Sequence, residues 1–227
     1  MGGRVQVLHL VRHGESTWNV ERRVQGGRHE PPLTDLGRTQ ASRAAAVLAD
    51  LAGDRAGLIL ASDQQRAVQT AEIIGATIGL QPISTPLLRE QGWGSLEGLT
   101  TTRALAELTG VELTNPNFRW AGGGESTNDV LARVTELLES AVVTELPSDA
   151  EAILVSHGDT IRVMVAHLLG EDLAEAPWRQ FENGSVTTLR ASPAPGSAAR
   201  WRLVDEPTAG TARGAVGQSS RRDRSLP

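Results

Sequence analysis

Short apolar runs alternate along this chain with segments whose apolar residues recur at helical spacing, and no other feature constrains its fold as strongly. Three runs, at residues 5–11, 57–61 and 151–156, are bounded by polar residues in the way that buried parallel strands are. The alternation predicts an α/β fold: a mainly parallel central sheet with helices on both faces and a small lid insertion. The predicted helices lie at residues 38–51, 63–78, 102–108, 126–142 and 158–169, and weaker strand patterns lie at residues 82–88, 185–189 and 200–204.

Capping side chains mark where three of these helices should begin. Thr34 is the expected cap of the first helix, Ser62 or Asp63 of the second, and Ser126 or Asn128 of the long helix after the lid. Short polar side chains at such positions accept the free backbone N–H groups of the first helical turn.

One domain and a tail account for the length of 227 residues. Residues 1–205 form the predicted domain. Within it, residues 91–124 combine glycines with Trp and Phe, which is typical of a lid over a site. Residues 206–227 are small and polar without periodicity, and this composition predicts a disordered tail.

The charge balance and the residue usage exclude several classes of protein. With a net charge of -5, the chain lacks the excess of basic residues by which proteins bind nucleic acid or an anionic membrane surface. No apolar run approaches the roughly 20 residues of a membrane span, and no secretory signal pattern opens the chain, so a cytoplasmic protein is expected. Because Cys and Lys are absent, a thiol nucleophile, a lysine Schiff base and a P-loop lysine are excluded.

Two of the predicted strands end in a histidine that is followed by a glycine. His13 follows the first strand, with Arg12 before it, and His157 follows a later strand. Because ligands of open α/β sheets bind beyond the carboxyl ends of the strands, both histidines are expected in one site. Arg12 offers a permanent positive charge to phosphate oxygens, Gly14 and Gly158 allow close approach of the backbone, and a helix start supplies free N–H groups. The pattern predicts a phosphate pocket.

Further motifs accompany the two histidines in the order typical of one known family. They are Arg12-His13-Gly14-Glu15 with Thr17-Trp18-Asn19, Arg23-Val24-Gln25-Gly26, Pro32-Leu33-Thr34 with Gly37, Arg66-Ala67-Val68-Gln69-Thr70-Ala71, Leu88-Arg89-Glu90, Leu96-Glu97-Gly98, Gly124-Glu125-Ser126, and Val155-Ser156-His157-Gly158. By these motifs the chain resembles the histidine phosphatase superfamily, also called the phosphoglycerate mutase-like family, over about residues 5–204. The resemblance implies the α/β fold of that family.

The resemblance also implies a phosphohistidine mechanism. Neutral His13 would attack the phosphorus and form a covalent intermediate. Arg12, Arg66 and His157 would hold the phosphoryl oxygens and offset their charge in the transition state. Glu90 would protonate the departing alkoxide and then take a proton from the attacking water.

Four further residues are expected, by the same resemblance, to contact the substrate. They are Asn19, Gln25, Gly26 and Gly158. Neither a metal ion nor a cofactor is needed for this chemistry. One position departs from the family pattern: Gln64 stands where the family usually has an apolar residue, which puts the packing beside Arg66 in question.

Other titratable residues are expected to be structural. On a strand, His9 and His13 would stand roughly 13 Å apart, so they are no metal pair, and His9 is predicted to be a core or edge histidine. His29 carries no supporting motif, and neither does His167. Glu15 and Asp159 each stand where a carboxylate could cap a helix as easily as act in catalysis. Neither residue is therefore assigned a catalytic role.

The sequence therefore predicts a cytoplasmic, metal-independent phosphomonoesterase acting on a small phosphorylated metabolite through a phosphohistidine. The runner-up is a phosphoglycerate mutase that depends on 2,3-bisphosphoglycerate. A mutase needs a second anion site, yet between Glu90 and the Gly124 block the only basic residues are Arg103 and Arg119. A third hypothesis, an inactive binding module, does not explain why nucleophile, acid and anchoring residues are all present.

The alcohol part of the substrate and the oligomeric state stay open, with a homodimer as one option. Trp93, Phe118 and Trp120 lie in the predicted lid, where they could either line an apolar pocket or pack against one another.

Overall fold

A central sheet organises the part of the chain that the structure describes. The structure is a computed structural model, and it describes residues 7–108, 115–140, 143, 146–147, 149–192 and 200–204. In these residues a six-stranded sheet has the order β3-β2-β4-β1-β5-β6. The strands are β1 (Val7–Arg12), β2 (Ala56–Ser62), β3 (Ile83–Thr85), β4 (Glu151–Ser156), β5 (Val186–Ser192) and β6 (Arg200–Leu203). The first four run parallel, and β5 and β6 are antiparallel to their neighbours.

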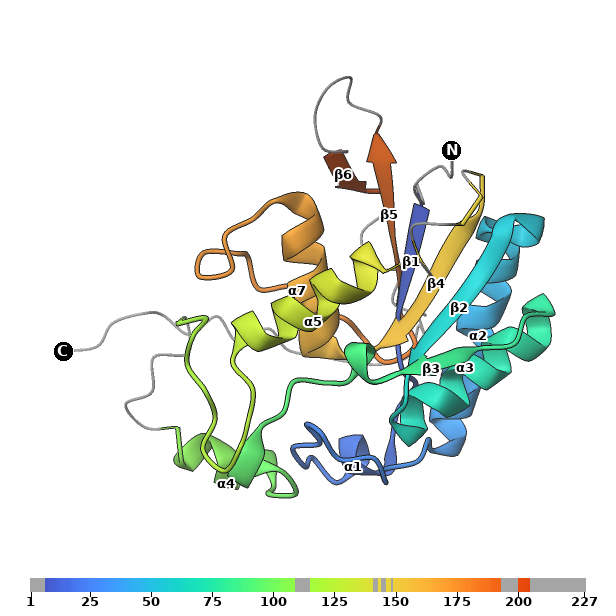
Figure 1. Cartoon of the computed structure of the whole chain (residues 1–227). Helices are drawn as coiled ribbons and strands as arrows, with labels where there is room; N and C mark the ends of the chain where they lie inside the picture. The colour runs from blue at the N-terminus through green and yellow to red at the C-terminus, as the bar shows by residue number, and fades with distance from the viewer. Residues whose placement is uncertain are drawn as a thin grey trace, which may run out of the picture.

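Helices cover both faces of the sheet, as the alternating pattern predicts (Figure 1). The helices are α1 (Thr17–Val20), α2 (Asp35–Leu51), α3 (Gln65–Ile78), α4 (Thr101–Ala106), α5 (Thr127–Glu139) and α7 (Gly158–Leu169). Side chains of successive strand residues point to opposite faces. Leu8, Leu10 and Leu154 pack in one core cluster with residues of α5 and α7, whereas Val11 and Val155 pack in a second cluster with residues of α2 and α3.

Two of the three predicted helix caps are confirmed and one is wrong. The Thr34 hydroxyl accepts the N–H of Gly37 at 3.0 Å, and Ser126 begins α5 with a capping box. The N-terminal cap of α3 is Gln64, whose side chain makes no capping bond, and Ser62 instead accepts the N–H of Gln64 at 3.3 Å. The position that departs from the family pattern is thus a helix boundary.

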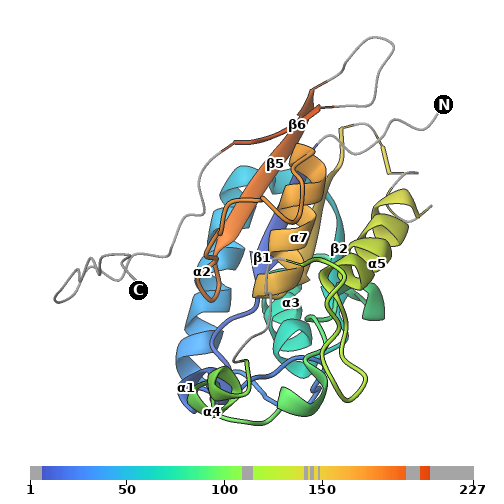
Figure 2. The ribbon, with the colours of Figure 1, turned by 90° about the vertical axis from the view of Figure 1, so that its left-hand side faces the viewer.

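The carboxyl ends of the parallel strands meet at one end of the molecule. Figures 1 and 2 show α1 and α4 at this end. Because β4 lies between β1 and β2, the segments after these three strands are neighbours there, and the segment after β3 joins them. The topology therefore brings together residues that are far apart in the sequence.

The aromatic residues of the predicted lid pack against one another. The rings of Trp93 and Trp120 stack with centroids 4.4 Å apart, and Phe118 meets Trp120 edge to face at 5.0 Å. With Leu96 and Ala104 they form a third core cluster. Of the two roles that the sequence leaves open, packing is the one that these contacts show. The predicted tail, residues 206–227, lies outside the described residues.

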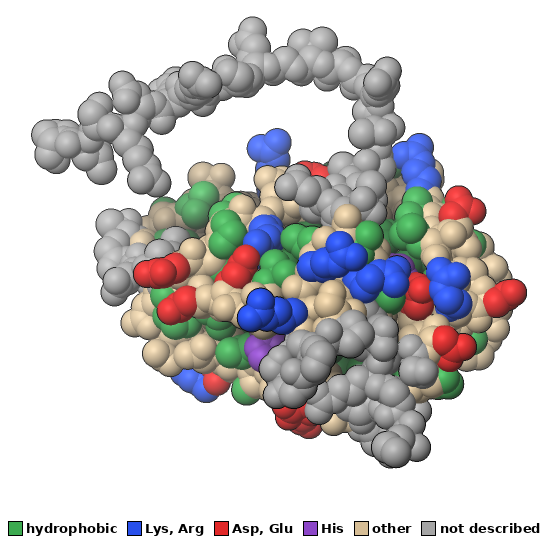
Figure 3. All heavy atoms as spheres, turned by 90° about the horizontal axis from the view of Figure 1, so that it is seen from above, with side chains coloured by type: hydrophobic (Ala, Val, Ile, Leu, Met, Phe, Trp, Pro, Cys, Tyr) green, Lys and Arg blue, Asp and Glu red, His purple; other side chains and the backbone are tan. Residues whose placement is uncertain are grey.

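On the uncovered part of the face seen in Figure 3, arginines lie among acidic and apolar side chains. In the described part of the chain, no helix combines the length and the apolarity that crossing a membrane requires.

Candidate active site

His13 and His157 lie side by side because β1 and β4 are parallel neighbours. Arg12 is paired with Ser156 in the register, and the N–H of His13 donates to the Ser156 carbonyl at 3.0 Å. The two imidazole rings have centroids 5.0 Å apart and are tilted by 58°. Both are buried. The predicted meeting of the two histidines is confirmed.

The Nε2 nitrogen of the His13 ring is unprotonated. Its Nδ1 lies 2.7 Å from the carbonyl oxygen of Gly14, which can only accept, so Nδ1 carries the proton. Burial lowers the pKa of His13 well below its usual 6.5, and the charges of Arg66 and Arg12 lower it further. The ring is therefore neutral near pH 7, and the lone pair on Nε2 is available.

Two arginines and His157 present hydrogen-bonding groups beside His13. Arg12 donates to the carbonyl of Phe181 at 2.5 Å, and Arg66 donates to that of Arg28 at 2.8 Å. Within the described ranges, the Nε of each arginine and both ring nitrogens of His157 are buried without a hydrogen-bond partner. Such groups are costly to bury unless a ligand satisfies them.

The charge at this centre is positive. Burial lowers the pKa of Arg66 to about 10, which still leaves the guanidinium charged at neutral pH. The pKa of His157 is lowered well below 6.5, first by burial and then by the charge of Arg66, so this ring is neutral. An anion with several oxygens satisfies such a centre, in agreement with the predicted phosphate pocket. In the described segments, no group of three or more His, Asp or Glu side chains could hold a metal ion.

Glu90 lies beside the start of α7. Its carboxylate accepts the N–H of Thr160 at 3.2 Å and that of Asp159 at 3.4 Å. Burial raises the pKa of Glu90, and the charge of Asp159 adds to the shift. Arg66 and Arg12 act on the same carboxyl in the opposite direction, so Glu90 shares the site of the two arginines. A buried carboxyl with a raised pKa is suited to proton donation.

The backbone around Glu90 is fixed by two polar side chains. The Gln64 Oε1 accepts the N–H of Glu90 at 2.9 Å, and Thr160 donates its hydroxyl to the carbonyl of Arg89 at 2.6 Å. The Gln64 amide also donates to the carbonyls of Gly26 and Arg28, at 2.8 and 2.9 Å. An apolar residue at position 64 could make none of these bonds. The side chain thus ties the loop of Glu90 to the loop that Arg66 also binds.

The expected substrate-contacting residues Asn19 and Gln25 lie together. Their side-chain oxygens both accept the Ser16 hydroxyl, at 2.9 and 2.8 Å. This orientation leaves their amide N–H groups available as donors. Gly26 has φ +48°, and a Cβ there would lie 2.4 Å from Oε1 of Glu97, so this turn requires glycine.

The backbone at both histidines makes contacts within the protein. A Cβ on Gly14 would lie 2.2 Å from the carbonyl oxygen of Gly37, so the packing of this segment against the start of α2 requires glycine. At the start of α7, the N–H groups of Asp159 and Thr160 hold the carboxylate of Glu90 and are not free for phosphate. At Gly158 a Cβ would lie 3.7 Å from the Arg12 side chain, an ordinary contact, so the expected contact with substrate stays a prediction there.

The remaining histidines and acids lie where the sequence predicts. His9 is buried between Glu151 at 2.7 Å and Thr188 at 2.9 Å, at the amino end of β4, which makes it a core histidine. His29 and His167 are exposed. Glu15 accepts the hydroxyl of the cap residue of α2, and Asp159 pairs with Arg162.

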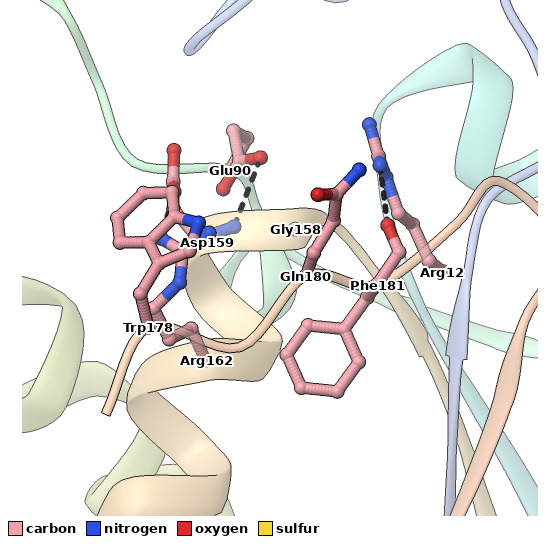
Figure 4. Close-up of a pocket in the computed structure, with 8 residues that line it drawn as sticks. All are labelled: Arg12, Glu90, Gly158, Asp159, Arg162, Trp178, Gln180 and Phe181. Atoms are coloured by element: carbon pink, nitrogen blue, oxygen red, sulfur yellow. Dashed lines mark hydrogen bonds and ion pairs between the residues drawn. The ribbon is translucent and has the colours of Figure 1, made fainter. Parts of the chain in front are cut away.

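A pocket that motif analysis does not find opens beside Arg12 and Glu90 (Figure 4). Its volume is about 250 Å³. The other residues that line it are Gly158, Asp159, Arg162, Trp178, Gln180 and Phe181. The last three belong to a loop without periodicity, in which an isolated Trp in polar sequence is the only signal that could have been noticed. Asn183, after this loop, donates to the His13 carbonyl at 3.1 Å and was also missed.

The buried histidines predict a pH dependence of stability. The pKa values of His9, His13 and His157 are lowered from 6.5, so the unfolded chain binds more protons than the folded protein below about pH 6.5. The free energy of unfolding should therefore fall between pH 7.5 and 5.5, by up to about 1.4 kcal/mol per pH unit for each histidine. The raised pKa of Glu90 acts in the opposite direction, because the folded protein then binds at most one proton more than the unfolded chain at this residue.

Urea unfolding at pH 7.5, 6.5 and 5.5 measures this slope. The His157→Gln variant should have a flatter profile, because one titrating group is gone. Equal slopes in the two proteins, or a stability that rises toward pH 5.5, would contradict the expectation.

Comparison with known proteins shows the family of this chain. The profile of the histidine phosphatase superfamily (branch 1) matches residues 8–203. The chain belongs to the histidine phosphatase superfamily. The family, its α/β fold and the enzyme class of phosphoric monoester hydrolase, all predicted from the sequence, are thereby confirmed.

The relatives include both phosphatases and mutase-like proteins. Glucosyl-3-phosphoglycerate phosphatase of Mycobacterium tuberculosis (strain ATCC 25618 / H37Rv) is 38% identical over 213 residues, covering 88% of this chain and 93% of that protein. A protein of Enterobacter sp. (strain 638) called "Probable phosphoglycerate mutase GpmB" is 34% identical, with coverages of 86% and 89%. A solved structure of mycobacterial glucosyl-3-phosphoglycerate phosphatase with VO3 has a TM-score of 0.77 at 33% identity, covering 88% of this chain and 98% of that chain.

Proposed function

We propose that this histidine phosphatase hydrolyses a phosphomonoester through a phosphohistidine formed on His13. The observation that carries the proposal is the neutral imidazole of His13, with Nε2 free, beside His157 and the charges of Arg12 and Arg66. A nucleophile that is unprotonated at neutral pH and surrounded by cationic donors is what attack on an anionic phosphate requires.

The reaction proceeds in two displacements at phosphorus. In the first, the His13 Nε2 forms a bond to phosphorus, the bond between phosphorus and the ester oxygen breaks, and Glu90 gives its proton to the departing alkoxide. In the second, Glu90 takes a proton from a water molecule whose oxygen attacks phosphorus, and the P–N bond breaks to release inorganic phosphate. Arg12, Arg66 and His157 offset the charge on the phosphoryl oxygens in both steps.

The substrate proposed for the first test is glucosyl-3-phosphoglycerate. Its support is the name of the 38% identical mycobacterial relative, whose length this chain matches almost throughout. A phosphatase needs one anion-binding centre, and among the described residues the group of Arg12, Arg66 and His157 supports one. A mutase must in addition hold the second phosphate of a bisphosphorylated intermediate and keep water from the phosphohistidine.

Two assays distinguish a phosphatase from a mutase: the release of inorganic phosphate and the interconversion of 3- and 2-phosphoglycerate. We expect the purified protein to release inorganic phosphate from phosphomonoesters, with no loss in EDTA, because arginines supply the positive charge. It should interconvert 3- and 2-phosphoglycerate poorly even with 2,3-bisphosphoglycerate present. Removing the residues after Asp205 should leave phosphate release within a few-fold. Efficient mutase turnover that depends on these residues would overturn the proposal, and so would zinc- or magnesium-dependent activity.

A further inference from the structure

The pocket beside Glu90 is where the alcohol part of a substrate must lie. Arg12 and Glu90 line this pocket together with Trp178 and Gln180 (Figure 4). If a phosphoryl group is bound by Arg12 and its ester oxygen faces Glu90, the rest of the alcohol continues into this space. The lining residues outside the phosphoryl centre are then the ones that can distinguish one alcohol from another.

Trp178 is the most exposed of the large apolar side chains in the described ranges, at 77% of its surface, and yet its ring is held in place. The guanidinium carbon of Arg162 lies 3.5 Å from the centroid of the indole ring. Arg162 is itself fixed, because it pairs with Asp159 and donates its Nε to the carbonyl of Arg179 at 3.2 Å. An indole with this exposure contributes little to the core. Because the Arg162 guanidinium covers one face of the ring, the exposed surface lies on the opposite face and the ring edges, where a ligand can pack.

The charges of the pocket favour a neutral ligand group over a second anion. The charge of Arg162 is offset by Asp159, with which it is in direct contact. A second phosphate would need a cation without an acidic partner, and the outer lining has none in the described residues. A neutral ring with hydroxyl groups fits better, because its C–H face can pack on the indole while its hydroxyls bond to the Gln180 amide.

We propose that Trp178, Arg162 and Gln180 form a leaving-group subsite for a neutral sugar ring linked to the phosphorylated alcohol. In this subsite Trp178 is the stacking surface, Arg162 positions the indole, and Gln180 bonds the sugar hydroxyls. The inference rests on the proposed phosphatase function and adds the residues that select the substrate.

The test compares two esters that differ only by the sugar: glucosyl-3-phosphoglycerate and 3-phosphoglycerate. The measured quantity is the ratio of their kcat/KM values, in which a general loss of folding or catalysis cancels. The parent protein should favour the sugar ester. Trp178→Ala should lower the ratio about tenfold, the size of a lost aromatic contact, mainly by raising KM for the sugar ester. Trp178→Phe should restore most of it, and Gln180→Leu should lower it less.

Leu51→Ala provides the matched control. Leu51 is also an exposed apolar side chain, at 40%, but it lies at the carboxyl end of α2 and does not line the pocket. This variant should keep the parent ratio. A parent protein without preference for the sugar ester, or a Trp178→Ala variant with an unchanged ratio, would overturn the subsite while phosphatase activity stands. If the parent released phosphate from neither ester nor from p-nitrophenyl phosphate, the proposed function itself would fall, and the subsite with it.

Discussion

Replacing His13 with alanine should lower phosphatase turnover by at least about 10³-fold, the scale on which enzymes respond to loss of a catalytic nucleophile. The reason is geometric: Nε2 is the unprotonated nitrogen of the His13 ring, whose centroid lies 5.0 Å from that of His157, and the charges of Arg66 and Arg12 act on the same ring. Water in the space left by the ring would lack both the fixed position and the nucleophilicity of imidazole. The measurement is release of inorganic phosphate from p-nitrophenyl phosphate and from glucosyl-3-phosphoglycerate.

Trapping the intermediate distinguishes a nucleophile from a merely structural histidine. With substrate carrying a labelled phosphoryl group, rapid quenching at alkaline pH should leave label on the parent protein, and acid should release it. The His13→Ala protein should carry none. His167→Ala serves as the matched control, since His167 is an exposed histidine on α7, and it should be labelled like the parent. Label that persists without His13 would show that another residue forms the covalent bond.

Glu90→Gln should slow the enzyme according to the leaving group. A strongly basic alkoxide needs a proton as it departs, whereas p-nitrophenolate leaves without one. The loss on an alkyl phosphate should therefore be about 10²- to 10⁴-fold, the usual contribution of general acid catalysis, and much smaller on p-nitrophenyl phosphate. Both values of kcat/KM are measured on the same preparation.

The pH profile gives a second measurement on Glu90. Because burial raises its pKa, the proton donor is present to a higher pH than an exposed glutamic acid would allow, and it is lost as the pH rises past that value. The parent should lose activity on the alkyl phosphate along this alkaline limb, and Glu90→Gln should lack the limb. Glu15→Gln is the matched control, because Glu15 bonds to Thr34 at the start of α2. Equal losses on both substrates would give Glu90 a positioning role instead.

Local sequence was enough to predict the strands and to name the two histidines at their carboxyl ends. The apolar run at 151–156 coincides with β4, and Thr34 begins α2 as its side chain predicts, because burial pattern and capping act over a few residues. The family motifs also named His13 and His157, and parallel pairing of their strands places the rings 5.0 Å apart. These features depend on residue type and order, which the sequence states directly.

The roles of several backbone groups depended on tertiary contacts. Gly14 follows His13 in the sequence, but the atom that excludes a side chain there is the carbonyl oxygen of Gly37, in another segment. The first N–H groups of α7 were expected to bind phosphate, and they bind Glu90, which arrives from a loop about 70 residues earlier. No local sequence pattern specifies whether a phosphate or the carboxylate of a distant residue binds the first N–H groups of a helix.

The sequence by itself determined the fold class and the family, and it named the residues proposed for the phosphoryl centre, because strand burial, helix capping and the motifs are properties of neighbouring residues. Only the tertiary structure decided how that centre is supported and what adjoins it. Gln64 shows this most directly: as a departure from the family pattern it had no evident role, whereas in the fold it joins the loops of Gly26 and Glu90. Trp178 reaches the pocket in the same way, since it lies 88 residues after Glu90 and its place depends on the packing of Arg162 on α7.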